Sequence, residues 1–322
     1  MKHARMANRL GRWLAFGAAL SFSLLGTLWL YFHPPAEVTR GLVYGERNGR
    51  PLTLDVARPA RPNGAGVLLM MSGGWKSQPG SFRPWIVAPL LRRGYTVFAV
   101  YHRSQPEVTV MQIVEDVHRA LDFVRAHAQD HGVDPARLGL MGASSGGHLA
   151  LMLACGADPK EGHAISGDSP AASPVRAVAV FFPVTDLLNL GDSTENPGDG
   201  GPPRNFVRAF GPGATNLAEW PVIGRKVSPI YHVHTGLPPI LIVHGDSDTL
   251  VPLDQSLRFQ QAAARHGAPV EVWVRRGGGH GWWNLPRDIR RIAAWFDRHL
   301  RQPQPPATAN QPPARVPPAS SS

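Results

Sequence analysis

The chain has 322 residues, of which 43% are hydrophobic and 17% charged, so it can bury a sizeable core and is not an intrinsically disordered protein. Its formal net charge of +10 would suit an anionic partner, but no run of five or more Lys or Arg occurs, and we expect no nucleic-acid partner. The single cysteine, Cys155, excludes an intramolecular disulfide and a multi-cysteine metal site, and its apolar neighbours predict a buried thiol.

Residues 1–36 carry the signals of a membrane-targeting segment. Basic residues come first, and about 20 uncharged, mostly apolar residues follow from Trp13 to Phe32. The aromatic end of this stretch and the absence of a small-x-small cleavage motif favour an uncleaved signal anchor over a cleaved signal peptide. Because the basic residues precede the span, the positive-inside rule places residues 37–301 on the extracytoplasmic side, periplasmic or extracellular, and cleavage would make them a secreted domain.

Residues 37–301 alternate short apolar runs with helical patterns, which predicts an α/β fold: a mostly parallel twisted sheet of about eight strands with helices on both faces. The first two strands should form an antiparallel lead-in. The predicted strands are Gly41–Tyr44, Leu52–Ala57, Val67–Met71, Thr96–Tyr101, Leu138–Met141, Ala177–Phe182, Ile240–His244 and Val270–Val274. The predicted helices are Phe82–Arg93, Val110–Gln129, Gly146–Cys155, Leu253–His266 and Pro286–His299.

Two segments depart from this alternation. Gly and Pro interrupt residues 187–225 repeatedly, which predicts an irregular excursion over the sheet, and either a lid-like substrate wall or a plain surface loop fits that pattern. Residues 302–322 are rich in Pro, Ala, Gln and Ser and have almost nothing apolar to bury, which predicts a disordered tail.

The sharpest local motif is a Gly-x-Ser-x-Gly sequence centred on Ser144. The apolar strand Leu138–Met141 precedes it and the helical pattern Gly146–Cys155 follows, which is the arrangement of a nucleophile elbow. A serine on such a turn presents its hydroxyl above the sheet. Ser144 is therefore the candidate nucleophile, and the backbone N–H of Ser145 is a candidate oxyanion donor.

A serine nucleophile needs a base and an acid that orients it, and in this fold class they follow the serine in the order acid, then histidine. His280 stands alone among glycines after a strand, where the backbone has the freedom to aim an imidazole. Asp186, Asp246 and Asp248 all lie at plausible strand ends. Asp248 is favoured because Leu250-Val251-Pro252 follows it and would hold its loop near His280, whereas Asp186 reads equally as a helix cap and Asp246 as a turn residue.

The turn after the strand Val67–Met71 is the candidate oxyanion loop. Backbone N–H groups of Gly73, Gly74 or Trp75 could complete an oxyanion hole together with Ser145.

With these motifs in place, residues from about Val43 to His299 resemble the esterase/lipase branch of the α/β-hydrolase superfamily. The resemblance is closest to feruloyl and acetylxylan esterases and their dienelactone-hydrolase and prolyl-oligopeptidase relatives. It rests on the elbow, the acid and histidine loops, and the recurrent phrases Asp134-Pro135-Ala136-Arg137, Gly146-Gly147-His148-Leu149-Ala150, Ser228-Pro229-Ile230 and Leu237-Pro238-Pro239. One departure is Ser72, which stands where the family commonly has the histidine of a His-Gly-Gly oxyanion loop.

The resemblance implies a serine esterase in which Ser144, Asp248 and His280 form a triad and an acyl-enzyme is hydrolysed by water, with no metal or organic cofactor. It implies a small-molecule or carbohydrate ester as substrate, with short acyl or hydroxycinnamoyl groups as the family-level expectation. Two alternatives stay open. One is a peptidase or amidase of the prolyl-oligopeptidase type, and the other is a membrane-tethered binding protein that keeps the fold without catalysis.

Overall fold

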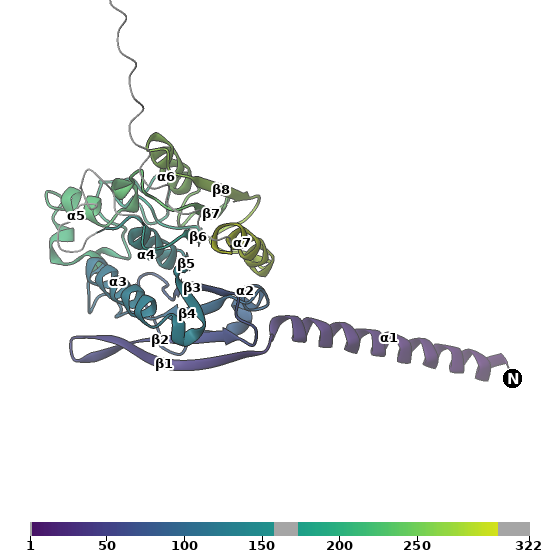
Figure 1. Cartoon of the computed structure of the whole chain (residues 1–322). Coiled ribbons are helices and arrows are strands. Elements are labelled where there is room, and N and C mark those ends of the chain that lie inside the picture. Colours follow the sequence, from purple (N-terminus) through teal and green to yellow (C-terminus); the bar gives the residue numbers. More distant parts are fainter. Residues whose placement is uncertain (1, 158–172, 302–322) are drawn as a thin grey trace, which may run out of the picture.

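An eight-stranded sheet forms the centre of the molecule (Figure 1). The computed structural model describes residues 2–157 and 173–301. The strand order is β1-β2-β4-β3-β5-β6-β7-β8; β1 and β2 pair antiparallel with each other and β2 with β4, and the remaining neighbours are parallel. The strands are β1 (Ala36–Arg47), β2 (Arg50–Pro59), β3 (Gly64–Met70), β4 (Thr96–Val100), β5 (Val133–Ala143), β6 (Ala177–Phe181), β7 (Ile240–Gly245) and β8 (Val270–Arg275).

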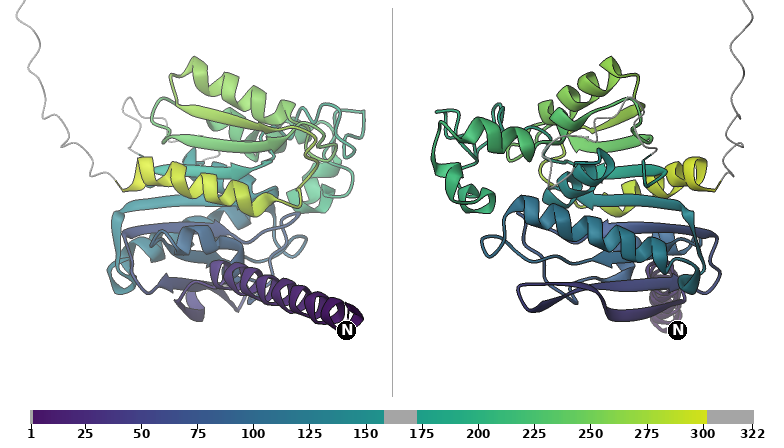
Figure 2. Two further views of the ribbon diagram at one scale, coloured as in Figure 1. Left: turned by 90° about the vertical axis from the view of Figure 1, so that its right-hand side faces the viewer. Right: turned by 60° about the vertical axis from the view of Figure 1, so that its left-hand side comes forward.

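Helices cover both faces of this sheet, so side chains on both sides of the central strands are buried. Figure 2 shows α7 against one face and α3 with α4 against the other. Along β6, Val178 and Val180 pack into the cluster that includes α3, α4 and α6, whereas Ala179 and Phe181 pack into the cluster that includes α2 and α7. The helices are α1 (Lys2–Phe32), α2 (Ala88–Leu91), α3 (Val110–Ala126), α4 (Ser145–Ala154), α5 (Trp220–Lys226), α6 (Asp254–Arg265) and α7 (Leu285–Leu300). This architecture confirms the predicted α/β-hydrolase fold.

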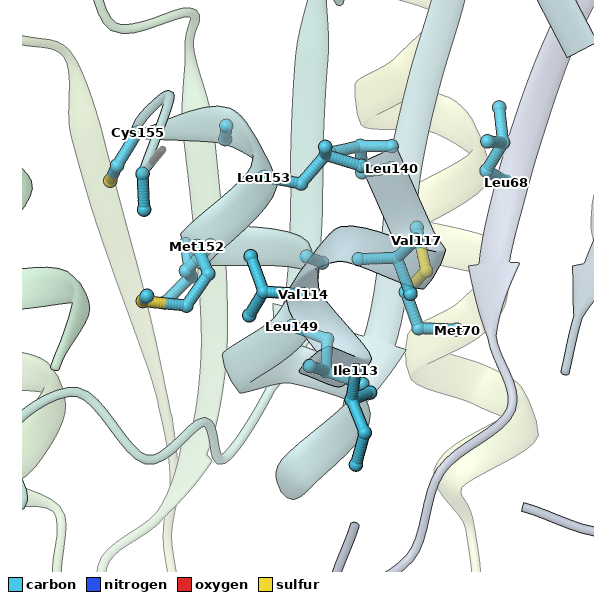
Figure 3. Close-up of a cluster of buried hydrophobic side chains, with 14 of the residues drawn as sticks. Leu68, Met70, Ile113, Val114, Val117, Leu140, Leu149, Met152, Leu153 and Cys155 are labelled. Atoms are coloured by element: carbon cyan, nitrogen blue, oxygen red, sulfur yellow. The ribbon is translucent and has the colours of Figure 1, made fainter. Parts of the chain in front are cut away.

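Aliphatic side chains fill the space between the sheet and the helix α4 that follows Ser144. Figure 3 shows this cluster, with labelled side chains from β3, α3, β5 and α4. Cys155, at the end of α4, is buried there as its apolar neighbours predict, and burial raises the pKa of its thiol to about 12. The thiol is therefore protonated at neutral pH and packs as a small hydrophobic group.

Two helix predictions needed correction. The predicted helix Phe82–Arg93 is instead a 3-10 turn over Pro84–Val87 followed by the short α2, because a proline stands at the start of each piece and ends the preceding hydrogen-bond ladder. The excursion 187–225, predicted as irregular, contains α5, whose Trp220 is fully buried. In Figure 2 the excursion stands off the sheet as a lobe of turns and short helices.

The N-terminal helix α1 points away from the rest of the molecule in Figures 1 and 2, and Phe22 and Trp29 on it are exposed. Within the part of the chain that the structure describes, no helix combines the length and apolarity needed to cross a membrane, so the predicted transmembrane span is not supported. The extracytoplasmic location stays a prediction. The predicted disordered tail, 302–322, lies outside the described residues.

A variant that begins at Glu37 should fold like the full chain. Few interactions join the removed part to the domain. The Arg92 guanidinium lies 5.0 Å from the Tyr31 ring centre and donates to the Leu30 carbonyl at 3.4 Å, the Ala60 N–H donates to the Pro35 carbonyl at 3.1 Å, and Ala36 pairs with Pro59 at the start of β1. These contacts lie at the edge of the domain, so their loss should cost about 1 kcal/mol, or roughly 2–4 °C in the midpoint of thermal unfolding. Calorimetry of the two proteins would check this, and a loss above about 10 °C would show that α1 belongs to the folding unit.

Candidate active site

Ser144 occupies a strained turn between β5 and α4. Its φ is +54°, a conformation that residues with a side chain rarely adopt. The chain can turn this sharply because the flanking residues are glycines: a Cβ on Gly142 would lie 2.3 Å from the Gly146 carbonyl oxygen, and one on Gly146 would lie 2.5 Å from the Met70 carbonyl oxygen. The turn thus places the Ser144 hydroxyl at the carboxyl edge of the sheet, as the sequence motif predicts.

His280 connects Ser144 to Asp248. Its Nε2 lies 2.9 Å from the Ser144 Oγ, and its Nδ1 lies 2.8 Å from the Asp248 Oδ2. A tight turn holds the imidazole, because the Gly281 N–H donates to the Gly279 carbonyl across it at 2.9 Å. Since a carboxylate can only accept, Nδ1 carries the proton and Nε2 is free to accept the hydroxyl proton of Ser144. The structure therefore brings all three predicted residues together.

Asp248 is buried and is held as a carboxylate by three hydrogen bonds and the nearby His244. Its Oδ1 accepts from the amides of Leu250 and Val251, both at 3.0 Å, and its Oδ2 accepts from His280 and faces the His244 Nε2 at 3.4 Å. Burial alone would raise the pKa of this group, but the hydrogen bonds from His244, His280 and the Val251 amide outweigh it and hold the pKa well below its usual range. Asp248 is therefore ionised at every pH at which a histidine can act as a base.

The other two candidate carboxylates do not reach His280. Asp186 accepts from the amides of Leu188 and Asn189 at 3.0 and 3.1 Å and forms a salt bridge with Arg258. Asp246 accepts from the Gly277 amide at 2.7 Å. Asp246 has the turn role that was its alternative in the sequence. Asp186 caps no helix, because none follows it: its side chain instead holds an irregular turn, so the helix-cap alternative is corrected. Only Asp248 has the geometry to orient the imidazole.

Two supporting side chains escaped the sequence reasoning. His244, at the end of β7, is fully buried and lies between the Ser256 hydroxyl and the Val251 carbonyl, each at 2.7 Å, so it fixes the loop that carries the acid. The Phe182 ring lies 4.5 Å from the His280 ring, centre to centre, and supports the imidazole. The His-Gly-Asp-Ser-Asp run could have drawn attention to His244, whereas nothing local distinguishes Phe182.

In the candidate oxyanion loop, the turn that contains Gly73, Gly74 and Trp75, two of the three predicted donor amides are free to bind an oxyanion. The Gly73 N–H already donates to the Lys76 carbonyl at 2.9 Å, so it is not available and that part of the prediction is corrected. The amides of Gly74 and Trp75 have no partner among the described residues, and both residues have positive φ, +55° and +56°. Ser72, which replaces the histidine common in the family, contributes a contact of its own. Its hydroxyl lies 3.1 Å from the Ser145 hydroxyl and so links this turn to the nucleophile elbow.

Trp75 also ties the oxyanion turn to α4 and to the excursion. Its indole N–H donates to the His148 Nδ1 at 3.2 Å, and the His148 Nε2–H donates to the Val227 carbonyl at 2.7 Å. Burial lowers the pKa of His148 to about 4, so the ring is neutral at pH 7 and can accept at one nitrogen and donate at the other. The rings of Phe206 and Phe210, from the excursion, pack edge-on against Trp75 at 5.5 and 5.4 Å.

A pocket of about 400 Å³ opens beside the Ser144 hydroxyl. This volume suits a small ligand. Its walls are mainly apolar, and the excursion forms much of one wall of the pocket. The excursion residues that line it are Leu187, Leu190, Ser193, Glu195, Pro203 and Phe206. Among the described residues, no cluster of His, Cys, Asp or Glu is arranged to hold a metal ion.

This fold, with a serine, a histidine and a carboxylate in hydrogen-bonded sequence at the carboxyl edge of the sheet, defines the α/β-hydrolase class. The BD-FAE family model matches residues 54–263. The chain therefore belongs to the BD-FAE family of α/β-hydrolase esterases.

Relatives agree with this assignment. The chain is 30% identical to Esterase LipQ of Mycobacterium tuberculosis over 79% of its own length, and it spans 59% of the length of that relative. A truncated carbohydrate esterase from gut microbiota superposes with a TM-score of 0.64 at 25% identity, covering 83% of this chain and 100% of that chain. Esterase 2 of Thermogutta terrifontis with butyrate bound superposes with a TM-score of 0.60 at 28% sequence identity, covering 82% of this chain and 94% of that chain. The same enzyme phosphonylated by sarin superposes with a TM-score of 0.62 at 27% identity and with the same coverage.

Replacing His148 with Leu should destabilise the fold by about 2–4 kcal/mol, because both the Trp75 indole and the Val227 carbonyl would be buried without a partner. Urea unfolding would measure the change. Trp75→Phe, which removes the indole donor and leaves the Val227 bond, is the matched comparison and should cost less. A loss below about 0.5 kcal/mol for His148→Leu would mean that these hydrogen bonds do not hold the turn.

Proposed function

We propose that the protein is a serine hydrolase that cleaves carboxylic esters. The observation that carries this proposal is the hydrogen-bonded sequence Ser144–His280–Asp248, with its 2.9 and 2.8 Å links, at the mouth of an apolar pocket. A hydroxyl, a neutral imidazole and an ionised carboxylate in this order supply a nucleophile, a base and a group that fixes the tautomer of the base. The esterases among the relatives support the same activity.

In this mechanism His280 takes the proton of Ser144 as the oxygen attacks the ester carbonyl. Asp248 stays ionised, keeps the proton on Nδ1 and stabilises the imidazolium. The amides of Gly74, Trp75 and Ser145 are the proposed donors to the negative charge that develops on the carbonyl oxygen. The imidazolium then protonates the departing alcohol, and a water activated by His280 hydrolyses the acyl-enzyme.

The pocket favours ester groups of short or medium length. Its volume of about 400 Å³ and its aliphatic and aromatic walls fit an acyl chain of a few carbons or a single ring. Butyrate in a relative of similar fold agrees with a short acyl group, and the gut-microbiota relative makes carbohydrate esters natural test substrates.

The decisive experiment compares wild type with Ser144→Ala on para-nitrophenyl esters of graded acyl length and on a matched anilide. We expect ester hydrolysis that falls with long chains, much slower anilide cleavage, and loss of activity in the variant. A fluorophosphonate probe should label wild type and not Ser144→Ala. Faster cleavage of the anilide than of the ester would favour a peptidase, and neither hydrolysis nor labelling would favour the binding protein.

Replacing Asp248 with Asn should leave the fold intact and lower turnover by something on the order of 10⁴, because the amide would favour the wrong tautomer of His280. Steady-state kinetics with a short-chain ester would measure this. The matched controls are Asp186→Asn and Asp246→Asn, which each alter a turn and should act mainly on stability. Near-full turnover in Asp248→Asn together with its loss in Asp186→Asn would mean that the acid is misassigned.

A further inference from the structure

One charged side chain lines the otherwise apolar substrate pocket. Glu195, in the excursion, is the only Asp, Glu, Lys or Arg among the described residues around this cavity. None of the ion pairs formed by the described residues includes it. Its negative charge is therefore not neutralised by a salt bridge to any of the described residues.

The carboxylate of Glu195 is held in one place by neutral donors. Asn205 donates its backbone N–H to Oε2 at 2.9 Å and its side-chain amide to Oε1 at 2.8 Å. Both oxygens are thereby fixed without loss of the negative charge, since an amide donates a proton but carries no positive charge.

The backbone of this segment is fastened to the loop that carries the triad acid. The Thr194 N–H donates to the Thr249 carbonyl at 2.9 Å, and the Ser193 hydroxyl donates to the Leu250 carbonyl at 2.6 Å. Glu195 consequently has a fixed place relative to Asp248. A fixed charge selects among ligands, whereas a mobile one would turn toward solvent.

From these observations we infer that Glu195 sets the charge selectivity of the enzyme: esters whose group in the pocket ends in a carboxylate are rejected, and neutral or cationic ones are accepted. This inference rests on the proposed esterase function. A carboxylate bound in the pocket would be repelled by the half-buried Glu195, whereas an ammonium group would be attracted by Glu195 and by the Phe206 ring, which lines the same cavity.

The net charge of the chain works in the opposite direction. At +10 the protein as a whole attracts anionic molecules at low ionic strength. Rejection of anionic esters would therefore have to come from the pocket. It should also persist at raised salt, which screens the long-range attraction more than the interaction inside the cavity.

The test uses three para-nitrophenyl esters of equal acyl length: the hexanoate, the hemi-adipate, which ends in a carboxylate, and one that ends in trimethylammonium. In a second series of esters the same charges are placed on the alcohol group. The inference requires that the enzyme discriminates against the anionic ester in at least one of the two series. We expect kcat/KM of wild type for the anionic ester to lie roughly tenfold below that for the neutral ester, and the cationic ester to match or exceed the neutral one.

Glu195→Gln should raise the ratio of anionic to neutral kcat/KM by roughly tenfold. Glu195→Asp keeps the charge while disturbing the Asn205 contacts, and it should retain the wild-type ratio. The matched control is Glu219→Gln in the same excursion: Glu219 also accepts from an asparagine amide, that of Asn216 at 2.7 Å, but does not line the pocket. This control should leave the ratio unchanged.

An unchanged ratio in Glu195→Gln, or an equal rise in Glu195→Asp, would overturn the inference. If Glu195→Gln does not fold, the measurements on wild type test the inference by themselves. Equal kcat/KM for the anionic and neutral esters in both series would then overturn the inference. Failure of the proposed function looks different: wild type would then hydrolyse none of the esters, or Ser144→Ala would hydrolyse them equally well.

Discussion

The positive φ of Ser144 is the constraint on which the site depends. This backbone conformation is unfavourable for a serine, and it persists because β5 and α4 are packed on both sides of the turn. Gly142 and Gly146 let the two arms of the turn touch. The packing of many residues therefore stabilises one strained residue. As a result, the backbone holds the Ser144 hydroxyl in one position at the edge of the sheet.

Much of the fold follows from the sequence because its signals are local. The central parallel strands contain short apolar runs that are buried on both faces, and α3 has a Thr109 capping box and a regular apolar stripe. The failures also have local causes. Pro84 and Pro89 divide one predicted helix into two short pieces, and α5 is a seven-residue helix, too short for its periodicity to stand out.

For the site, sequence order and glycine content were enough to select Ser144 and His280, because each is marked by its immediate neighbours. The supporting contacts could not be predicted in this way. The Trp75–His148 hydrogen bond joins positions 73 residues apart, and the Gly73 amide is lost to the oxyanion hole through a bond to Lys76 that only the folded turn shows. The pocket wall likewise depends on how an irregular segment folds back, which local patterns do not encode.

The contacts around Trp75 have a mechanical consequence for the pocket. Phe206 and Phe210 of the excursion rest on Trp75, and the carbonyl of Val227, just beyond the excursion, is bonded to the same histidine that holds the indole. Moving the pocket wall outward would therefore pull on the turn that carries the Gly74 and Trp75 amides. Access to the pocket and the geometry of this turn are in this sense mechanically coupled: with the wall displaced, the pocket would admit larger molecules, but the turn would lose the contacts that hold it in place.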